Sequence, residues 1–216
     1  MPLMRAVGRQ LSYPEGHAGR AIGAVMDLVN RLPVSLALDL LAAAPGERVI
    51  DVGCGTGAAS QRLLQRVPCA VACVDRSPTM LRRARQRQYL TGSLHRPGDH
   101  DSTVTFHLAA LGELPFSPAS FDAALALNVL YFCDAAGAML ADLKRVLCPG
   151  GRLVCYVTHR DTMARWPFVS PGTHRLFDAQ DLVQALIAGG FGPDRIMVRE
   201  CTINRQVRGL LALAKV

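Results

Sequence analysis

The stretch VIDVGCGTGAAS, Val49 to Ser60, decides the fold class of this 216-residue chain. An apolar run ends in an acid, Asp51, and passes directly into a loop that contains Gly53, Gly55 and Gly57. Glycine adopts positive φ angles easily and lets a ligand lie against the backbone. The pattern therefore predicts a buried strand, a ligand-binding loop and a helix, and it leaves the ligand open.

The composition is typical of a globular protein, with 50% hydrophobic and 19% charged residues. A chain of this length fits one domain with a substantial core. The apolar segment Leu32 to Gly46 contains Asp39 and is too short to span a bilayer. It also starts too late for a signal peptide. We therefore expect a soluble, cytoplasmic protein without stable membrane insertion.

The seven cysteines and the net charge of +7 say little about function. An odd cysteine count, without a CxxC pair or a His/Cys cluster, predicts neither a disulfide framework nor a metal site. The densest basic cluster is RRARQR, Arg82 to Arg87, which we interpret as a solvated helix face. No aromatic residues that could stack on bases are interleaved with it, so nucleic acid is not the expected partner.

Strands and helices alternate along the chain. Apolar runs predict strands over 48–53, 70–75, 103–107, 121–128, 152–158, 195–201 and 208–215. Helices are expected over about 18–31, 34–44, 58–67, 78–89, 134–147 and 179–188. Strands separated by helices pair in parallel through right-handed crossovers, whereas the last two strands leave no room for a crossover. The pattern predicts an α/β, doubly wound sheet whose last pair is antiparallel.

Ligands of such sheets bind at the carboxyl ends of the strands, near the topological switch point. That edge would receive the loop Gly53 to Gly57, Asp75, the loop after His107, Asn128 and the pair Thr158-His159. We therefore expect one crevice lined by these segments.

Two acids narrow the choice of ligand. Gly53-x-Gly55-x-x-Ala58 satisfies the dinucleotide fingerprint and lacks the GK[ST] of a phosphate loop. Asp51 lies two residues before Gly53, where a carboxylate would repel a pyrophosphate and suits a ligand with an ammonium group, such as S-adenosylmethionine. Asp75 ends the second strand, where it can accept hydrogen bonds from both ribose hydroxyls of either S-adenosylmethionine or NAD.

Five segments then occur in a characteristic order between about Leu41 and Val216: VIDVGCGTG, VDRSPTML, LPFSPASFDAALALNVLYF, LKRVLCPGGRLV and LFDAQDLVQALIAGGF. On these motifs the chain resembles the class I S-adenosylmethionine-dependent methyltransferases, in the small-molecule branch that includes quinone-biosynthesis enzymes. The resemblance implies a Rossmann-like fold with a seven-stranded, mostly parallel sheet in the order 3-2-1-4-5-7-6, strand 7 being antiparallel. It also implies a single domain over 1–216, with a lid and helices in 1–45 and the core in 46–216.

The same resemblance implies roles for the residues of the first two motifs. The backbone of Gly53, Cys54 and Gly55 would lie against the methionine part and the ribose of the cofactor. Asp51 would lie near the ammonium group, and Asp75 would hold the ribose hydroxyls.

Further roles follow for residues after the second and fourth strands. Arg76 and Met80 would flank the adenine, with Met80 as an apolar cover. Asn128 and Val129 would line the floor beside the sulfonium.

The chain departs from the family pattern after the third strand. The family often has an acid followed by Ala there, which meets the adenine amino group, but this sequence has Ala110 and Leu111. Adenine binding would then depend on backbone groups and apolar contact.

Methyl transfer from a sulfonium is an in-line displacement, for which alignment can lower the barrier by about 7–11 kcal/mol. His159 and Tyr131 follow the fifth and fourth strands and are the candidate catalytic residues. Asn128-x-x-Tyr131 is similar to the motif of adenine-specific DNA methyltransferases but lacks its two prolines.

The segment Gly8 to Arg20, GRQLSYPEGHAGR, resembles the N-terminal lid of small-molecule members. Its residues Gln10, Tyr13 and His17 would contact the cofactor carboxylate or the substrate. The loop from His159 to Phe177 would add an apolar wall.

We therefore expect a methyltransferase that acts on a small, partly apolar acceptor and converts S-adenosyl-L-methionine to S-adenosyl-L-homocysteine. One alternative is a methyltransferase directed at RNA, DNA or protein. Another is a non-catalytic module that binds S-adenosylmethionine or a dinucleotide. The acceptor atom, the use of a general base and the oligomeric state are left open.

Overall fold

The computed structural model describes residues 27–90, 102–167, 169 and 174–216. The strands in these ranges are β1 (Arg48–Val52), β2 (Ala70–Asp75), β3 (Thr103–Leu108), β4 (Phe121–Leu127), β5 (Leu147–Thr158), β6 (Ile196–Thr202) and β7 (Arg208–Lys215). The helices are α3 (Arg31–Leu41), α4 (Ala58–Arg66), α5 (Pro78–Leu90), α6 (Ala138–Val146), α7 (Arg160–Met163) and α8 (Ala179–Ala188). Two short 3₁₀ helices, η1 (Leu130–Phe132) and η2 (Pro193–Arg195), complete the elements.

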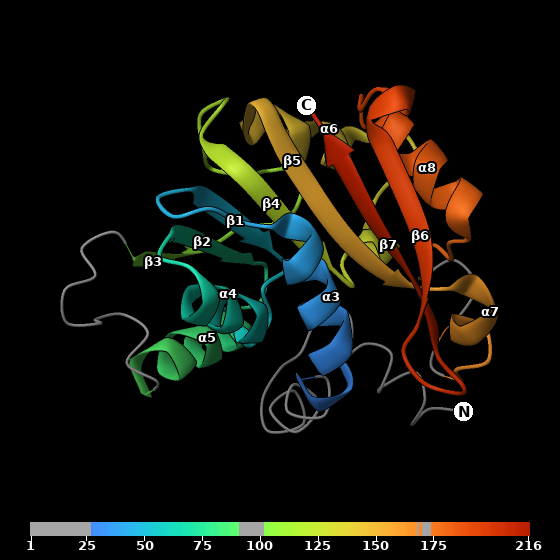
Figure 1. Cartoon of the computed structure of the whole chain (residues 1–216), viewed down its shortest axis with the longest axis horizontal. Helices are drawn as coiled ribbons and strands as arrows, with labels where there is room; N and C mark the ends of the chain where they lie inside the picture. Colours follow the sequence, from blue (N-terminus) through green and yellow to red (C-terminus); the bar gives the residue numbers. More distant parts are fainter. Residues whose placement is uncertain (1–26, 91–101, 168, 170–173) are drawn as a thin grey trace.

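The strands form one sheet in the order β3-β2-β1-β4-β5-β7-β6 (Figure 1). Strands β3, β2, β1, β4 and β5 are parallel, and β7 pairs antiparallel with both β5 and β6. The predicted α/β, doubly wound, seven-stranded sheet is confirmed, including the antiparallel strand 7. The parallel strands point their carboxyl ends to the same edge, which is where ligands of such sheets bind.

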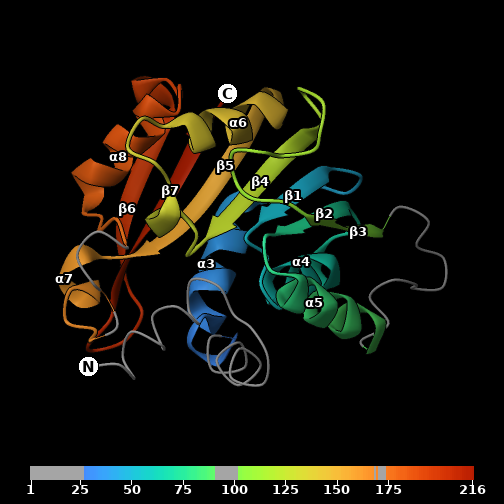
Figure 2. The same ribbon diagram turned by 180° about the vertical axis from the view of Figure 1, so that it is seen from behind.

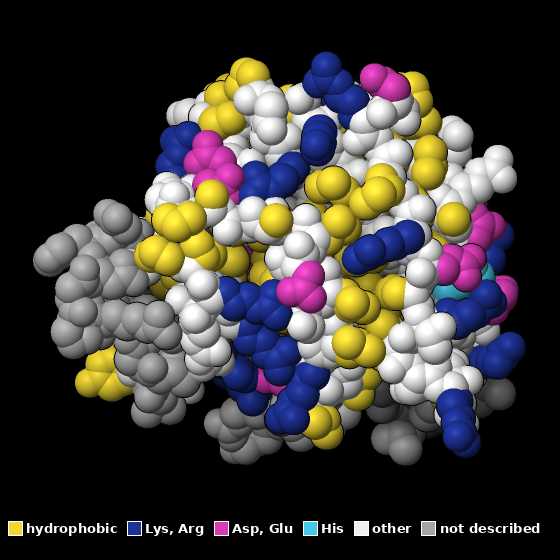
Figure 3. Space-filling model, viewed as in Figure 1, with side chains coloured by type: hydrophobic (Ala, Val, Ile, Leu, Met, Phe, Trp, Pro, Cys, Tyr) yellow, Lys and Arg dark blue, Asp and Glu magenta, His cyan; other side chains and the backbone are white. Residues whose placement is uncertain are grey.

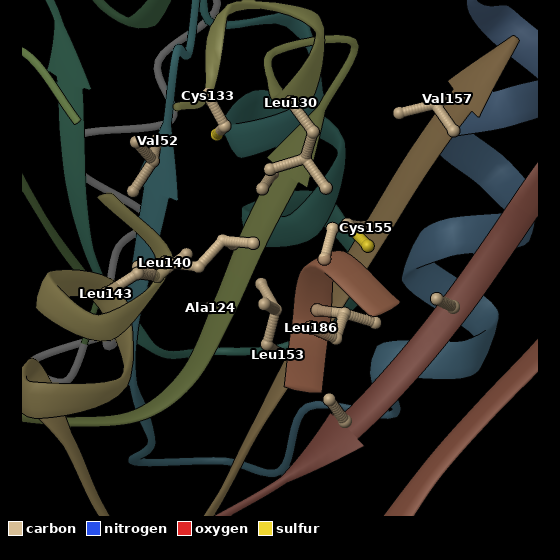
Figure 4. Packing of buried hydrophobic residues seen from close by; sticks show 14 of the residues in the cluster. Val52, Ala124, Leu130, Cys133, Leu140, Leu143, Leu153, Cys155, Val157 and Leu186 are labelled. Atoms are coloured by element: carbon tan, nitrogen blue, oxygen red, sulfur yellow. The ribbon is translucent and has the colours of Figure 1, made fainter. Parts of the chain in front are cut away.

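Helices cover both faces of the sheet (Figures 1 and 2). Helices α3, α4 and α5 pack on one face and α6 and α8 on the other. Figure 4 shows Leu140 and Leu143 of α6 and Leu186 of α8 beside the sheet residues Ala124 and Leu153. All five side chains are buried, and each buried leucine contributes about 1.5–3 kcal/mol relative to exposure. This apolar packing holds the strand ends, and with them the loops, in fixed positions.

The predicted N-terminal helices are only partly within the described residues. Residues 27–29 are helical, and α3 spans Arg31–Leu41 where the sequence predicted 34–44. The helix ends early because Ala42 adopts a left-handed conformation, with φ at 46°.

Helix α6 begins four residues later than predicted, at Ala138. Gly137 precedes it in the left-handed conformation, with φ at 82°, which interrupts a continuous helix. The Asp134 carboxylate accepts hydrogen bonds from the N–H groups of Ala138 and Met139 and so satisfies the start of the helix.

Strand β5 begins earlier than predicted, at Leu147 instead of Arg152. Leu147 pairs with Phe121, and the register then shifts so that Ala123 pairs with Arg152. The CPGG stretch between these two positions forms an irregular part of the strand. The sequence did not predict a strand there, because Pro and Gly are typical of turns.

Candidate functional site

A cavity of about 230 Å³ lies where the carboxyl ends of β1, β2 and β4 meet. The loops after β1, β3 and β4, the end of β2 and the first residues of α3 provide most of its wall. Its lining consists of Asp27, Asn30, Pro33, Val34, Asp51, Val52, Gly53, Cys54, Gly55, Thr56, Ala58, Ala59, Arg62, Asp75, Arg76, Met80, Ala109, Ala110, Leu111, Leu127, Asn128, Val129 and Phe132.

The glycine-rich loop after β1 presents its backbone to this cavity. Gly53 and Gly55 have φ angles of 68° and 55°, which other residues rarely adopt. A Cβ at Gly53 would lie 2.8 Å from Cγ2 of Val129, so a side chain has no room there. A Cβ at Gly55 would meet no atom within 4 Å. The loop is therefore packed against the β4 side at Gly53 and open at Gly55.

Asp75, at the end of β2, is held by two backbone groups. The N–H of Gly55 donates to Oδ2 and the N–H of Ser77 donates to Oδ1, each at 2.8 Å. Burial raises the pKa of Asp75, and these two hydrogen bonds oppose that rise. Each carboxylate oxygen can accept a further hydrogen bond, so Asp75 can bind a pair of hydroxyl groups from the cavity.

Asp51 lies within β1, below the glycine-rich loop, and its side chain is almost fully buried, with 2% exposure. Burial raises its pKa to about 6, the hydroxyl of Ser60 opposes this, and the carboxylate of Asp75 raises it further. Ser60 donates to Oδ2 of Asp51 at 2.5 Å. Burial disfavours the charge of a carboxylate in this position, so a cationic group in the cavity would stabilise it.

The far side of the loop is fixed by Arg87 of α5. Its Nε donates to the carbonyl of Thr56 at 2.9 Å, and its guanidinium also pairs with the carboxylate of Asp27. The hydroxyl of Thr56 donates to Oδ1 of Asp27 at 2.5 Å. These three residues join α5, the glycine-rich loop and the helical residues 27–29 beside the cavity.

The interpretation of the arginine cluster as a solvated helix face is wrong at Arg87. Its spacing from Met80 and Ala84 places it on the inner face of α5, and that spacing was the signal available in the sequence. Asp27 and Asn30 were also missed, because nothing in their local sequence indicates a contact with the loop.

The wall beyond Asp75 is mostly apolar. Met80 is buried and borders the cavity, and Ala110 and Leu111 follow β3. The guanidinium of Arg76 lies over the ring of Phe132, 5.3 Å from its centroid. A flat, partly apolar ligand group fits a wall of this kind.

Asn128, directly after β4, has a φ angle of 58° and takes part in a chain of hydrogen bonds. Its Nδ2 donates to Oδ1 of Asn30 at 2.9 Å, and its Oδ1 accepts from the hydroxyl of Tyr131 at 2.8 Å. The hydroxyl of Tyr131 in turn accepts from the backbone N–H of Thr158 at 2.5 Å. Asn30 and Asn128 line the cavity, whereas Tyr131 lies behind Asn128.

The structure brings eleven of the predicted site residues to one cavity and leaves two described ones outside it. The eleven are Asp51, Gly53, Cys54, Gly55, Asp75, Arg76, Met80, Ala110, Leu111, Asn128 and Val129. Tyr131 and His159 are buried and do not line the cavity. Gln10, Tyr13 and His17 lie outside the described residues.

His159 serves as the N-cap of α7. Its Nδ1 accepts a hydrogen bond from the N–H of Asp161 at 3.2 Å. Its Nε2 lies 3.7 Å from Oε1 of Glu200. These contacts tie the end of β5 to β6 and give His159 a structural role in the described part of the chain.

None of the helices in the described ranges has the length and apolar character needed to cross a membrane.

Comparisons with known proteins identify methyltransferases as relatives of this chain. The model of a family described as "Methyltransferase domain" matches residues 50–155. A demethylmenaquinone methyltransferase of Tropheryma whipplei is 40% identical over 124 residues, which are 57% of this chain and 47% of that protein. The chain thus spans about half the length of that relative.

A second relative is covered more completely. The O-methyltransferase rstn1 of Aspergillus nomiae is 32% identical over 178 residues, 80% of this chain and 74% of that protein. Among solved structures, an S-adenosylmethionine-dependent methyltransferase from Mesorhizobium loti superposes with a TM-score of 0.66 at 21% identity, over 87% of this chain and all of that one, and so shares the fold. The identity to rstn1 over most of its length, together with the matched domain, means that this chain belongs to the class I S-adenosylmethionine-dependent methyltransferase family.

Proposed function

We propose that this chain binds S-adenosylmethionine in the cavity and moves its methyl group to a small, partly apolar acceptor. The observation that carries the proposal is the pair of acids at neighbouring strands. Asp75 is fixed at the open edge by two backbone donors, and Asp51 is buried beneath the glycine-rich loop. Asp75 suits vicinal hydroxyls and Asp51 suits a cation, and S-adenosylmethionine carries both of these groups.

The sheet order supports one direction for the proposed ligand. Strands β2, β1 and β4 are neighbours, so Asp75, the glycine-rich loop and Asn128 follow one another along the edge. With the ribose at Asp75, the adenine meets the apolar wall of Met80 and Leu111. The methionine part then runs past Gly53 toward Asn128.

When bound, S-adenosylmethionine supplies a methyl group that its sulfonium activates for in-line displacement. The residues of this chain contribute position and exclusion of water. Val129 and Phe132 are apolar, and they line the same cavity as Asn128. Alignment in such a pocket can lower the barrier by about 7–11 kcal/mol.

A small acceptor is supported by the relatives, which include a demethylmenaquinone methyltransferase. The distribution of charge also favours it over RNA or DNA. Figure 3 shows one group of Lys and Arg side chains below the centre of one face and others scattered over it, with hydrophobic and acidic side chains between the scattered ones. Several arginines are paired with carboxylates, as Arg152 is with Glu47 and Arg66 with Asp39. A nucleic-acid enzyme needs a continuous basic surface.

We propose that the protein is located in the cytoplasm. All seven cysteines are free thiols, which is typical of proteins kept in a reducing environment.

Calorimetry with S-adenosylhomocysteine, NAD and NADP tests the cofactor. We expect S-adenosylhomocysteine to bind in the micromolar range and the two dinucleotides to bind at least about 100-fold more weakly, a difference of roughly 2.7 kcal/mol. Tighter binding of NAD would favour the dinucleotide module and reject the proposal. A salt-dependent affinity for RNA would favour the macromolecular acceptor instead.

A further inference from the structure

The chain of hydrogen bonds behind the cavity fixes the orientation of two carboxamides. The backbone N–H of Thr158 can only donate, so the hydroxyl of Tyr131 must accept from it. The proton of that hydroxyl is directed to Oδ1 of Asn128, 2.8 Å away. The group of Asn128 that faces Tyr131 is therefore its carbonyl oxygen.

The orientation of Asn30 follows by the same reasoning. With its oxygen toward Tyr131, Asn128 turns its NH₂ group toward Asn30, at 2.9 Å. Asn30 must present its oxygen to accept that hydrogen bond, and its own NH₂ group points away from Asn128. The chain from Thr158 through Tyr131 thus determines the oxygen and nitrogen positions of both amides.

This arrangement gives the cavity hydrogen-bond donors at Asn30 and Asn128. Each NH₂ group has two hydrogens. One hydrogen of Asn128 is used by Asn30, and among the described residues no partner takes the remaining hydrogen of Asn128 or the two of Asn30. Both residues line the cavity.

We infer that Asn30 and Asn128 recognise an oxygen of the acceptor molecule, and that the substrate class is one with a carboxylate, carbonyl or phenolate oxygen next to the atom that is methylated. Tyr131 is a positioning residue, which acts by holding the amide of Asn128. The inference rests on the proposed function, because that places the methyl group beside Asn128. Three donor hydrogens match an oxygen with its lone pairs and do not match an ammonium group.

The position of the pair agrees with this role. Asn30 precedes α3 and Asn128 follows β4, so the two amides meet across a separation of 98 residues only in the folded protein. Asn128 holds a φ of 58°, a conformation that asparagine tolerates better than most residues. Burial raises the pKa of Tyr131 to about 12, so its hydroxyl keeps the proton that orients Asn128 at neutral pH.

The test uses three probes that share one ring system: 2-naphthoate, 2-naphthol and 2-naphthylmethylamine. Each is titrated into the full chain saturated with S-adenosylhomocysteine, and its affinity is measured by calorimetry. We expect the two oxygen probes to bind at least tenfold more tightly than the amine. Equal affinities, or no binding of either oxygen probe at millimolar concentration, would overturn the inference.

The decisive variant is Asn30→Asp. It keeps the oxygen that accepts from Asn128 and replaces only the outward NH₂ group by an oxygen. We expect the affinity of the oxygen probes to fall at least tenfold and the affinity of the amine to rise. Tyr131→Phe should reduce the preference for oxygen several-fold, because Asn128 is then free to turn. If the role of Tyr131 were purely structural, Tyr131→Phe would lower the affinities of all three probes alike. That result would contradict its positioning role.

Two controls separate the possible failures. Asn204→Asp makes the same change in the exposed turn between β6 and β7, where the Asn204 side-chain oxygen accepts from the N–H groups of Gln206 and Val207. It should leave the affinities of all probes unchanged. Binding of S-adenosylhomocysteine is measured first on every protein. If the unchanged chain fails to bind it, the proposed function is wrong; if it binds and the oxygen preference is absent, only the present inference is wrong.

Discussion

The backbone N–H of Gly55 donates a hydrogen bond to the carboxylate of Asp75, with 2.8 Å between N and Oδ2. This contact joins the loop after β1 to the end of β2. The same hydrogen bond fixes the Asp75 carboxylate at the open edge of the sheet and orients the glycine-rich loop. The proposed binding of the ribose depends on this pair.

Replacing Asp75 by Ala should therefore strongly weaken the binding of S-adenosylhomocysteine. The change removes two charge-assisted hydrogen bonds to the ligand, which corresponds to about 2–4 kcal/mol. Calorimetry measures the effect, and Asp194→Ala, an exposed acid in η2, is the control. Near-normal binding to the Asp75 variant would show that the ribose lies elsewhere.

Gly55→Ala should abolish cofactor binding with a modest loss of stability. Gly55 has φ at 55° and its Cβ would meet no protein atom within 4 Å, so the added methyl group enters the cavity. Gly46→Ala is a matched control, because Gly46 has φ at 79°, has equally open space, and lies before β1 at the opposite end of the same strand.

Both alanine variants should lose about 1–2 kcal/mol of unfolding free energy from the left-handed backbone. Urea unfolding gives that value, and calorimetry gives the affinity for S-adenosylhomocysteine. Equal affinities of the two variants would remove Gly55 from the site.

Arg87→Ala should lower both the stability and the cofactor affinity. Its guanidinium binds the Thr56 carbonyl and the Asp27 carboxylate, and it is partly buried, with 29% of the side chain exposed. Loss of these charged hydrogen bonds corresponds to about 1–3 kcal/mol. Arg82→Ala on the exposed side of the same helix should change the free energy of unfolding by less than about 0.5 kcal/mol. A cofactor affinity that stays the same in both variants would mean that Arg87 does not support the loop.

Binding of S-adenosylhomocysteine should weaken below pH 6. Burial raises the pKa of Asp51 from 3.8 to about 6, so the folded, ligand-free protein takes up a proton on this group as the pH falls through 6. The ammonium group of the ligand favours the ionised carboxylate, and the affinity should fall about fivefold between pH 6 and pH 5 and about tenfold for each further pH unit. Asp51→Asn should flatten most of this dependence, with the remainder due to Asp75, whose pKa is also raised by burial.

The same shift has a consequence for stability. Because the folded protein binds the proton more readily than the unfolded chain, Asp51 stabilises the fold at low pH, and this contribution is lost as the pH rises from 3.8 to about 6. Urea unfolding of the unchanged chain and of Asp51→Asn isolates this contribution, because the carboxylates whose pKa is lowered, such as Glu47 and Asp122, are common to both. The unfolding free energy of the unchanged chain relative to the variant should fall as the pH rises from 3.8 to about 6. A difference that rises over this range would mean that Asp51 is ionised at little cost in the folded protein.

Local pattern explains what the sequence could predict. The apolar run to Asp51 and the glycines after it identify strand and loop, because both properties reside in adjacent residues. The short turn 203–207 leaves no space for a crossover, which makes the last pair antiparallel. The strand order, in contrast, came from the family resemblance, since no local property of the chain specifies it.

Contacts between distant elements explain what could not be predicted. Tyr131 was predicted to face the acceptor, which no contact of the structure tests; the path of η1 places its hydroxyl against Asn128 and Thr158. His159 was predicted for the same role, which likewise stays a prediction, and its side chain caps α7. Asn30 meets Asn128 only because α3 packs across β4 and β5, and the sequence contains no signal of that packing.

A crystal structure of the full chain with S-adenosylhomocysteine tests the central claim most directly. We predict that both ribose hydroxyls lie within about 2.5–3.2 Å of the Asp75 carboxylate, with the homocysteine part past Gly53 and the sulfur on the side of Asn128. A ligand that lies outside this cavity, or one whose ribose contacts neither oxygen of Asp75, would contradict it.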